Sequence, residues 1–512
     1  RMPKWVGELY LEFHRGTYTS MAKNKRNNRK CEFLLQETET VASIGKVLLK
    51  NKYPNEELEN NWRKLLLNQF HDIIPGSSIK EVYDDSDKDY AEIYREVGKI
   101  KTDNMESIAH NIGEKGMVVF NPNSFAVSDY VKTPDNKMVF AKNIPPMGWK
   151  IVDNEPMPED VTVSADRKTI ESKHYLIKFD DDMNIKSIFD IDFNREIIKD
   201  GEKMNQLVAY EDYPKDWDNW EITDYYKQKK WQVNDIIETD VICGNGYGGF
   251  RVKRRYMNSI IEQEIIAYSE SRRIDVKNHI DWREHHILLK AEFAADIHTS
   301  NARYDIQFGN IERSNCENTS WEAAKFEVCA HKWGDLSEGN YGVSILNDCK
   351  YGYSAEGNKM TLSLIKCGTY PNPEADNGLH EFTYSIYPHE KDARCGGTIE
   401  EAYVLNRPLS ASYSLGQGNL PSEYSAVAVD CRNIMIEMIK EAESGDGLVF
   451  RAFDVANIKS KAKIKFGFNV KEAYVCDLME NRTEKISVVN DEITVDVFNN
   501  EIVTINIIPV SW

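Results

Sequence analysis

Two adjacent residues that could do chemistry, His71 and Asp72, lie in the stretch NQFHDIIPGSS at residues 68–78. An imidazole can bind a metal ion or carry a proton, and a carboxylate can accept hydrogen bonds from hydroxyl groups. The same pair could instead satisfy unpaired backbone groups where a helix ends. A zinc ion needs three or four protein ligands, and the neighbouring sequence offers no second one. Residue types alone therefore favour the structural interpretation.

His14 is a second candidate, at the end of an alternating pattern that begins at Trp5. The alternation predicts a strand, and Gly16 indicates that it runs into a loop. Glu8 and Glu12 share the predicted face of His14. Strand ends often carry active-site residues, so these side chains could form a pocket wall. A solvated strand face explains the pattern equally well.

Aromatic and acidic residues alternate in YEDYPKDWDNW at residues 210–220. Such mixtures are typical of sugar sites, because rings stack on C–H faces and carboxylates accept hydroxyl protons. They are also ordinary at the corners of β-sandwiches, and both interpretations stay open. The histidines in IDWREHH (280–286) and HEFTYSIYPHE (380–390) lie in strand-like patterns, which favours a structural role.

The elements that must position these residues change character along the chain. Residues 20–112 predict three helices with short connections, typical of a three-helix bundle. Pro75 disfavours helix at Ile74, so the second helix is expected to end near His71. Ser78 and Glu81 match a capping box that would start the third helix.

Short alternating runs separated by Gly, Asn, Asp and Pro follow residue 113 and predict strands and turns. The expected fold class is α+β and mainly β, with the helical bundle followed by a large antiparallel β-sandwich and small β domains. The expected domains are a strand at 1–17, a three-helix domain at 18–112, a small β segment at 113–160, a β-sandwich at 161–430 and a small β domain at 431–512.

Composition excludes several classes of function. The net charge of −19 argues against a nucleic-acid partner, which requires a basic face. No apolar run is long enough to predict a membrane span, and no signal peptide is visible at the start. The nine cysteines are irregularly spaced and contain no C-x-x-C pair, which is typical of reduced thiols in a cytoplasm. We therefore expect a cytoplasmic protein.

Two long motifs occur in order near the start, GELYLEFHRGTYTSMAKNKRNNRKCEFLL and WRKLLLNQFHDIIPGSSIKEVYDDS. Together with FNPNSF, YPKDWDNW, YDIQFGNIER and EADNGLHEFTYSIYPH further on, they closely resemble glycoside hydrolase family thirty-eight, the α-mannosidases. The resemblance covers essentially the whole chain. It is strongest to the bacterial and cytosolic-vacuolar branch.

The resemblance implies a role for each candidate residue. His71 matches a zinc ligand of the family, Asp72 matches a carboxylate that bonds sugar hydroxyls, and His14 matches a position that lines the mannose pocket. It also implies that the nucleophile and the acid/base carboxylate lie in an N-terminal α/β domain, of which this chain holds only the last strand. The expected cofactor is Zn²⁺ with an incomplete site, and the expected partner is a mannose-containing oligosaccharide.

The resemblance implies retaining hydrolysis of α-mannosides by the whole protein and no activity for this chain alone. A different class of function remains open, because the large sandwich resembles the supersandwich of sugar mutarotases. Such a domain could bind carbohydrate or mediate assembly, possible homo-oligomers included, without chemistry. A mutarotase-like epimerase is a third alternative, which needs a histidine and a carboxylate that converge in the sandwich.

Overall fold

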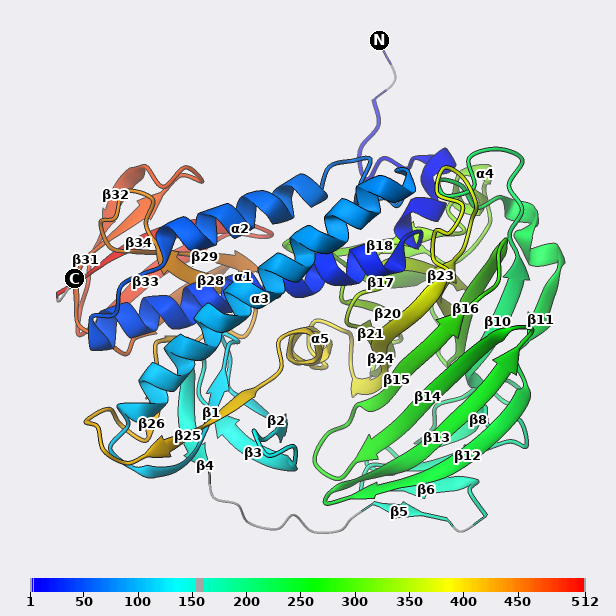
Figure 1. The fold of residues 1–512 in the computed structure, drawn as a ribbon, viewed down its shortest axis with the longest axis horizontal. Helices are drawn as coiled ribbons and strands as arrows, with labels where there is room; N and C mark the ends of the chain where they lie inside the picture. Colours follow the sequence, from blue (N-terminus) through cyan, green and yellow to red (C-terminus); the bar gives the residue numbers. More distant parts are fainter. Residues whose placement is uncertain (1, 3, 153–160, 165, 511–512) are drawn as a thin grey trace.

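The computed structural model describes residues 2, 4–152, 161–164 and 166–510. Three long helices lie across one side of the molecule, and antiparallel sheets form most of the rest (Figure 1). The prediction of a mainly β fold with a helical N-terminal region is confirmed. No helix among the described residues is long and apolar enough to cross a bilayer. The expected boundary at residue 160 borders 153–160, which lie outside the described residues.

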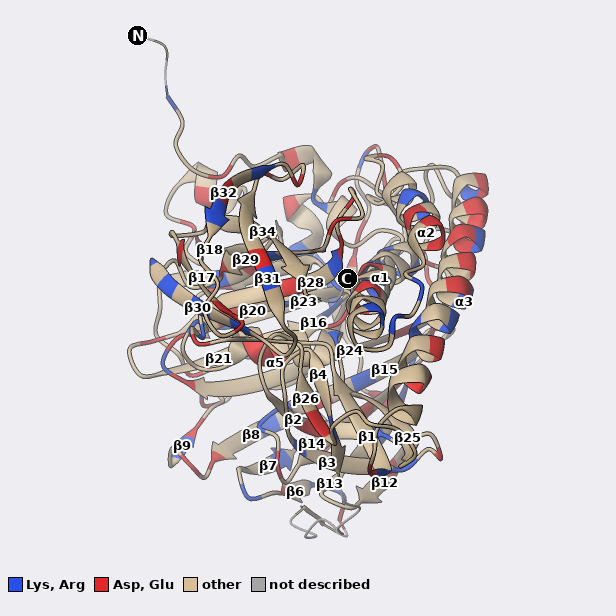
Figure 2. Cartoon of the chain, turned by 90° about the vertical axis from the view of Figure 1, so that its left-hand side faces the viewer, with Lys and Arg blue, Asp and Glu red and all other residues tan. Residues whose placement is uncertain are grey.

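The three helices are α1 Ala22–Leu49, α2 Asn55–Asn68 and α3 Lys80–His110. They share an apolar core to which α1 contributes Leu35, α2 contributes Leu65, and α3 contributes Tyr90, Ile93 and Val97. The spacing of the α3 residues places them on one helical face. Acidic residues recur along the length of α3 in Figure 2. Many residues between the core positions of this helix are exposed, so its opposite face is solvated.

Two large antiparallel sheets form the sandwich, and their facing side chains share one core. Phe179 of the first sheet meets Phe250 of the second edge to face, with ring centroids 5.2 Å apart. The first sheet contains β5 Thr162–Val163, β6 Thr169–Glu171, β7 Tyr175–Phe179, β8 Ile185–Asp190, β9 Arg195–Glu196, β10 Met204–Glu211, β11 Lys230–Gln232, β16 Ile287–Ala294, β19 Val328–Cys329, β22 Gly352–Glu356 and β23 Lys359–Lys366. The second contains β12 Asp235–Gly244, β13 Tyr247–Tyr256, β14 Ser259–Tyr268, β15 Ile274–Trp282, β17 Asn301–Ile306, β18 Gly309–Ser314, β20 Trp333–Ser337, β21 Tyr341–Asn347 and β24 Gly378–Glu390.

Smaller sheets cover the other end of the helices. They contain β1 Lys115–Asn121, β2 Val127–Lys132, β3 Met138–Ile144, β4 Gly148–Val152, β25 Ser410–Leu415, β26 Glu423–Ser425, β27 Val427–Val429, β28 Ile434–Glu441, β29 Leu448–Asp454, β30 Ser460–Phe466, β31 Val470–Cys476, β32 Arg482–Ile486, β33 Glu492–Val497 and β34 Ile502–Pro509. The short helices are α4 Ser320–Ala323 and α5 Thr398–Asn406, with 3-10 turns η1 Glu12–His14, η2 Gly16–Tyr18 and η3 Asp224–Gln228.

Strands β25 and β26 depart from the expected domain division. They pair with β1 and β4 in a four-stranded sheet, whereas the sequence placed 410–425 in the sandwich at 161–430. The alternation of a strand indicates its two faces but does not identify a partner almost three hundred residues away. The chain thus leaves the small β segment, forms the sandwich and returns to complete the first sheet.

Two local predictions near the candidate site are wrong. Residues 5–14 form no strand: no described strand pairs with 4–11, and the turns η1 and η2 follow. Alternation produces a strand only where a neighbouring strand completes its hydrogen bonds. The capping box is also absent, because α3 begins after Ile79 without a side-chain cap. The Ser78 hydroxyl instead donates to the Asp72 carbonyl oxygen at 2.6 Å.

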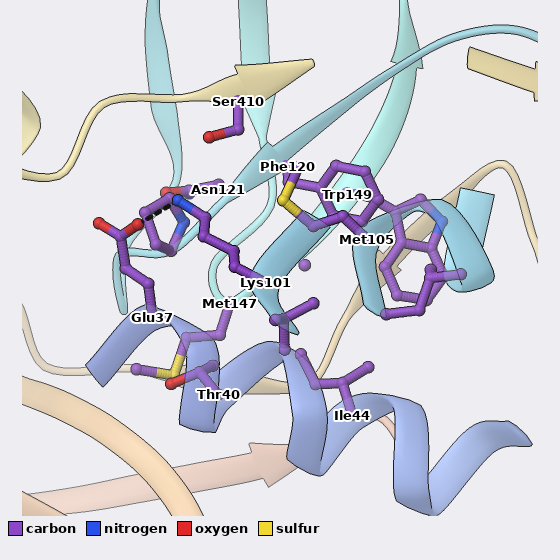
Figure 3. A pocket seen from close by; sticks show the side chains of 14 residues that line it. Glu37, Thr40, Ile44, Lys101, Met105, Phe120, Asn121, Met147, Trp149 and Ser410 are labelled. Carbon is purple, nitrogen blue, oxygen red and sulfur yellow. Dashed lines mark hydrogen bonds and ion pairs between the residues drawn. The ribbon is translucent and has the colours of Figure 1, made fainter. Parts of the chain in front are cut away.

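A small cavity marks the contact of α1 and α3 with β1 and β4. Figure 3 shows Glu37 of α1 and Lys101 of α3 joined by an ion pair beside it, with Trp149 of β4 on the opposite wall. Its volume is about 40 Å³. That is room for very few water molecules and not for a sugar ring, so this cavity is a packing feature.

Candidate functional site

His71 and Asp72 lie in the turn that follows α2. Their side chains are 78% and 54% exposed, and His71 Nε2 is 3.5 Å from Asp72 Oδ2. The Phe70 ring packs on the imidazole with centroids 4.2 Å apart. Both polar groups therefore face solvent and are accessible to a ligand. The backbone contributes to closing the helix end, because the Asp72 carbonyl accepts from the Ser78 hydroxyl at 2.6 Å.

Buried hydrogen bonds hold the turn that carries this pair. Lys25 of α1 donates from Nζ to the Ile74 carbonyl at 2.8 Å, and the Tyr83 hydroxyl donates to the Ile73 carbonyl at 3.1 Å. Gly76 has a φ of +89°, and a Cβ there would lie 2.5 Å from the Ser20 carbonyl oxygen. Only glycine fits this close approach without strain. The exposed pair thus sits on a rigid base.

Lys25 is itself part of a buried charged group. Burial lowers the pKa of its ammonium and raises the pKa of the nearby Asp376 carboxyl. Asp376 accepts the amides of Met21 and Ala22 at 2.7 and 2.6 Å, at the start of α1. A carboxylate suits the positive end of the helix dipole. The group therefore joins the sandwich, the start of α1 and the His71 turn.

His14 lies beside a cavity of about 610 Å³ at the edge of the sandwich. The cavity is lined by Phe13, His14, Pro214, Lys215, Asp216, Trp217, Trp220, Glu221 and Thr223. Trp217 is 57% exposed and meets Trp220 edge to face at 5.3 Å. His14 Nδ1 is buried and has no hydrogen-bond partner among the described residues. The structure thus brings His14 and the aromatic-acidic segment 210–220 into one pocket.

Backbone and side-chain bonds fix the two walls of this pocket to each other. The Gly16 amide donates to the Trp220 carbonyl at 2.8 Å. Arg15 Nη1 is 3.2 Å from Glu221 Oε1, and its Nη2 donates to the Ala324 carbonyl at 2.8 Å. Burial raises the pKa of Glu221, although Arg15 opposes the shift. An aromatic pocket with carboxylates at its edge can take the apolar face and hydroxyls of a sugar.

Asn219 connects this pocket to the turn of His71. Its side-chain amide donates to the Gly76 carbonyl at 2.9 Å, and its own carbonyl accepts the Ser20 hydroxyl at 2.7 Å. All three residues are buried. The three sequence candidates, His14, His71 and Asp72, therefore belong to one connected region, built from the end of α2, the segment before α1 and the loop after β10.

The described residues do not form a zinc site by themselves. No group of three or more His, Cys, Asp and Glu that could hold a metal occurs among them. His71 and Asp72 offer two ligands at one place, and a zinc ion requires three or four. Zinc would fit here only with ligands contributed from elsewhere.

Two histidines of the remaining histidine-rich segments contact neighbouring groups of the protein. His380 is buried and bonds the Asp376 carbonyl at 2.7 Å, and burial lowers its pKa to about 4. His286 lies 3.6 Å from Asp218 and stacks near Tyr213. Sequence reasoning missed Lys25 and Asn219, which position the turn and the pocket. Only the Pro75-Gly76 break signalled that this turn would be tightly packed.

Three family models match consecutive parts of the chain. The alpha mannosidase middle domain matches residues 12–108, the C-terminal domain of glycosyl hydrolases family 38 matches 170–374, and the C-terminal beta sandwich domain of that family matches 433–505. The chain belongs to glycosyl hydrolase family 38. The resemblance that the sequence motifs indicated is confirmed at the level of the family.

Proteins similar in sequence to this family 38 chain are named alpha-mannosidases. Human Alpha-mannosidase 2C1 is 33% identical over 500 residues, which cover 93% of this chain and 48% of the human protein. The Alpha-mannosidase of Saccharomyces cerevisiae is 29% identical over 514 residues, which cover 94% of this chain and 46% of the yeast protein. The chain thus spans about half the length of the curated relatives it matches.

A solved structure shares the fold. An alpha-mannosidase from Enterococcus faecalis V583 superimposes with a TM-score of 0.84 at 14% identity. The match covers 96% of this chain and 68% of the bacterial chain. The arrangement of helices and sheets described above is therefore that of a known structure over nearly its whole extent.

Proposed function

We propose that this chain is the middle and C-terminal part of an α-mannosidase that hydrolyses mannose-containing oligosaccharides. Family membership and relatives named alpha-mannosidases support the reaction class. The observation that carries the site is the connection of the exposed His71–Asp72 pair to the aromatic pocket of His14 through Asn219. A sugar that lies on the Trp217 ring would have His14 in the same pocket, and the His71–Asp72 turn is joined to that pocket through Asn219.

Each residue has a proposed part in binding. The exposed Asp72 side chain accepts hydrogen bonds from sugar hydroxyls, and hydrogen bonds to a carboxylate are stronger than neutral ones. The Trp217 and Phe13 rings take the apolar face of the sugar, and His14 lines the same pocket. His71 provides one imidazole to a Zn²⁺ ion whose other ligands come from outside this chain.

In the same proposal, carboxylates outside this chain carry out the bond cleavage. Retaining glycoside hydrolysis uses two carboxyl groups about 5 Å apart, one as nucleophile and one as acid and base. The contribution of this chain is to bind and orient the sugar against that pair. A cytoplasmic location and assembly into oligomers also stay predictions.

The proposal is tested with the purified 512-residue chain and para-nitrophenyl α-mannoside. We expect no release of nitrophenol, because binding groups without the two reacting carboxylates do not split the bond. The full-length protein, assayed in parallel, should turn the substrate over. Turnover by the 512-residue chain, or none by the full-length protein, would show the proposal to be wrong.

A further inference from the structure

A third cavity lies between the helices and the C-terminal sheet, where α1 and α2 meet β28 (Figure 1). Its volume is about 480 Å³, within the range of sites for small molecules. It is lined by Glu39, Tyr53, Asn55, Leu58, Glu59, Trp62, Met438, Lys440, Glu441, Ala442 and Glu443. None of these residues belongs to the region of His71 and His14, so this cavity is a separate feature.

Two carboxylates of the cavity lining each have one buried oxygen without a hydrogen-bond partner among the described residues. Glu39 is 6% exposed; its Oε1 accepts the Trp62 indole N–H at 3.1 Å, and its Oε2 has no hydrogen-bond partner among the described residues. Glu441 is 7% exposed; its Oε1 is 3.0 Å from Lys46 Nζ, and its Oε2 is likewise unpaired. Buried acceptors without a donor are costly, so a ligand that donates to both would be stabilised.

The charge around the cavity favours a positive ligand. Glu59 and Glu443 add two more carboxylates to its lining, beside Glu39 and Glu441. The Lys440 ammonium, which also lines the cavity, is already engaged by Glu443 and by Glu480 at 2.9 Å. Lys46 pairs with Glu441, and Arg63 pairs with Glu59. Glu39 is therefore the carboxylate of this lining that has no ion pair among the described residues, and a cation would supply one.

The remaining walls are apolar. The Trp62 indole, the Tyr53 ring and the side chain of Leu58 line the cavity together with Met438. Indole and phenol rings attract ammonium groups over their faces and also pack against aliphatic chains. The ligand should therefore combine a positive donor group with a hydrocarbon body.

We propose that this cavity binds a small organic cation, an aliphatic primary amine whose ammonium group donates to Glu39 and Glu441 and whose carbon chain lies on Trp62. The site is additional to the proposed mannoside site and does not depend on it. The unpaired oxygen of Glu39 belongs to α1, and that of Glu441 belongs to β28. The bound amine would therefore connect the helices to the C-terminal sheet.

Calorimetric titration of the 512-residue chain with putrescine and with spermidine tests the proposal. We expect one molecule to bind per chain with a dissociation constant below 1 mM. Glu39→Gln keeps the shape of the side chain and removes its charge, and should weaken binding at least tenfold. Glu441→Gln is a second variant with the same expectation, used if the first one fails to fold by circular dichroism.

Glu57→Gln is the matched control, because Glu57 is an exposed glutamate of α2, next to the lining residue Leu58, and does not itself line the cavity. It should bind both amines as the unmodified chain does. If neither putrescine nor spermidine binds, the proposal is wrong. It is also wrong if Glu57→Gln weakens amine binding as much as the cavity variants do. Binding of methyl α-mannoside that both cavity variants abolish, without amine binding, would show that the ligand is a neutral polyol instead.

Discussion

His71 and Asp72 are neighbours whose loss should have separable effects in the full-length protein. His71→Ala should lower the zinc bound per protein molecule to less than half, because an imidazole ligand is removed. Asp72→Asn should keep the metal and lower kcat/KM roughly 10- to 100-fold, the equivalent of about 1.5–3 kcal/mol for hydrogen bonds to a charged group. Metal analysis and kinetics on the same preparations give both values.

The control at this scale is His279→Ala. His279 is an exposed histidine on β15, with a side chain 53% exposed and 3.7 Å from Glu381. Its removal should change neither zinc content nor kcat/KM. Unchanged zinc in His71→Ala would contradict the ligand assignment, whatever happens to the rate.

At the scale of elements, the turn between α2 and α3 contrasts with the interior of α3. Gly76→Ala should destabilise the protein by more than about 2 kcal/mol, because the position has positive φ and touches the Ser20 backbone. Gly98→Ala should stabilise it by about 0.5–1 kcal/mol, because among the described residues no atom beyond the adjoining helix backbone lies within 4 Å of the added methyl group, and alanine favours helix. Urea unfolding of both variants measures the difference, and shifts of equal sign would contradict it.

The helices of this region could be predicted from local sequence, and their contacts could not. Apolar spacing and Pro75 located α2, α3 and the break between them, because these signals act within a few residues. The strand expected at 5–14 did not form, because strands depend on partners that alternation does not reveal. Lys25 and Asn219 gave no signal, because their bonds to Ile74 and Gly76 cross between distant segments.

At the scale of the whole molecule, α1 is the element that connects the two ends. Arg29 donates to the Asn347 side chain at 2.8 Å and to the Lys350 carbonyl at 3.0 Å, at the edge of the sandwich. About four turns further along α1, Ser43 donates to the Ile439 carbonyl of β28 at 3.2 Å. Helix α1 has buried residues on almost every face, and many of them are polar, so its sequence shows little amphipathic pattern. Its position in the centre of the molecule therefore could not be predicted from the sequence.

Arg273 provides the corresponding connection on the other side of the molecule. Its guanidinium lies 2.9 Å from Asp129 of β2 and 2.7 Å from Glu401 of α5, just before β15 begins. Arg273 and Asp129 are both buried. One cation thus joins the small β segment, α5 and the sandwich.

Arg273→Met should therefore lower the free energy of unfolding by about 3–5 kcal/mol, because Asp129 and Glu401 lose their counter-charge. The matched control is Arg251→Met, which removes a surface pair with Glu264 at 2.6 Å and should cost less than about 1 kcal/mol. Urea unfolding followed by circular dichroism compares the two. Similar losses for both variants would mean that the buried cation contributes no more than a surface pair, and that the domains are held together by apolar packing alone.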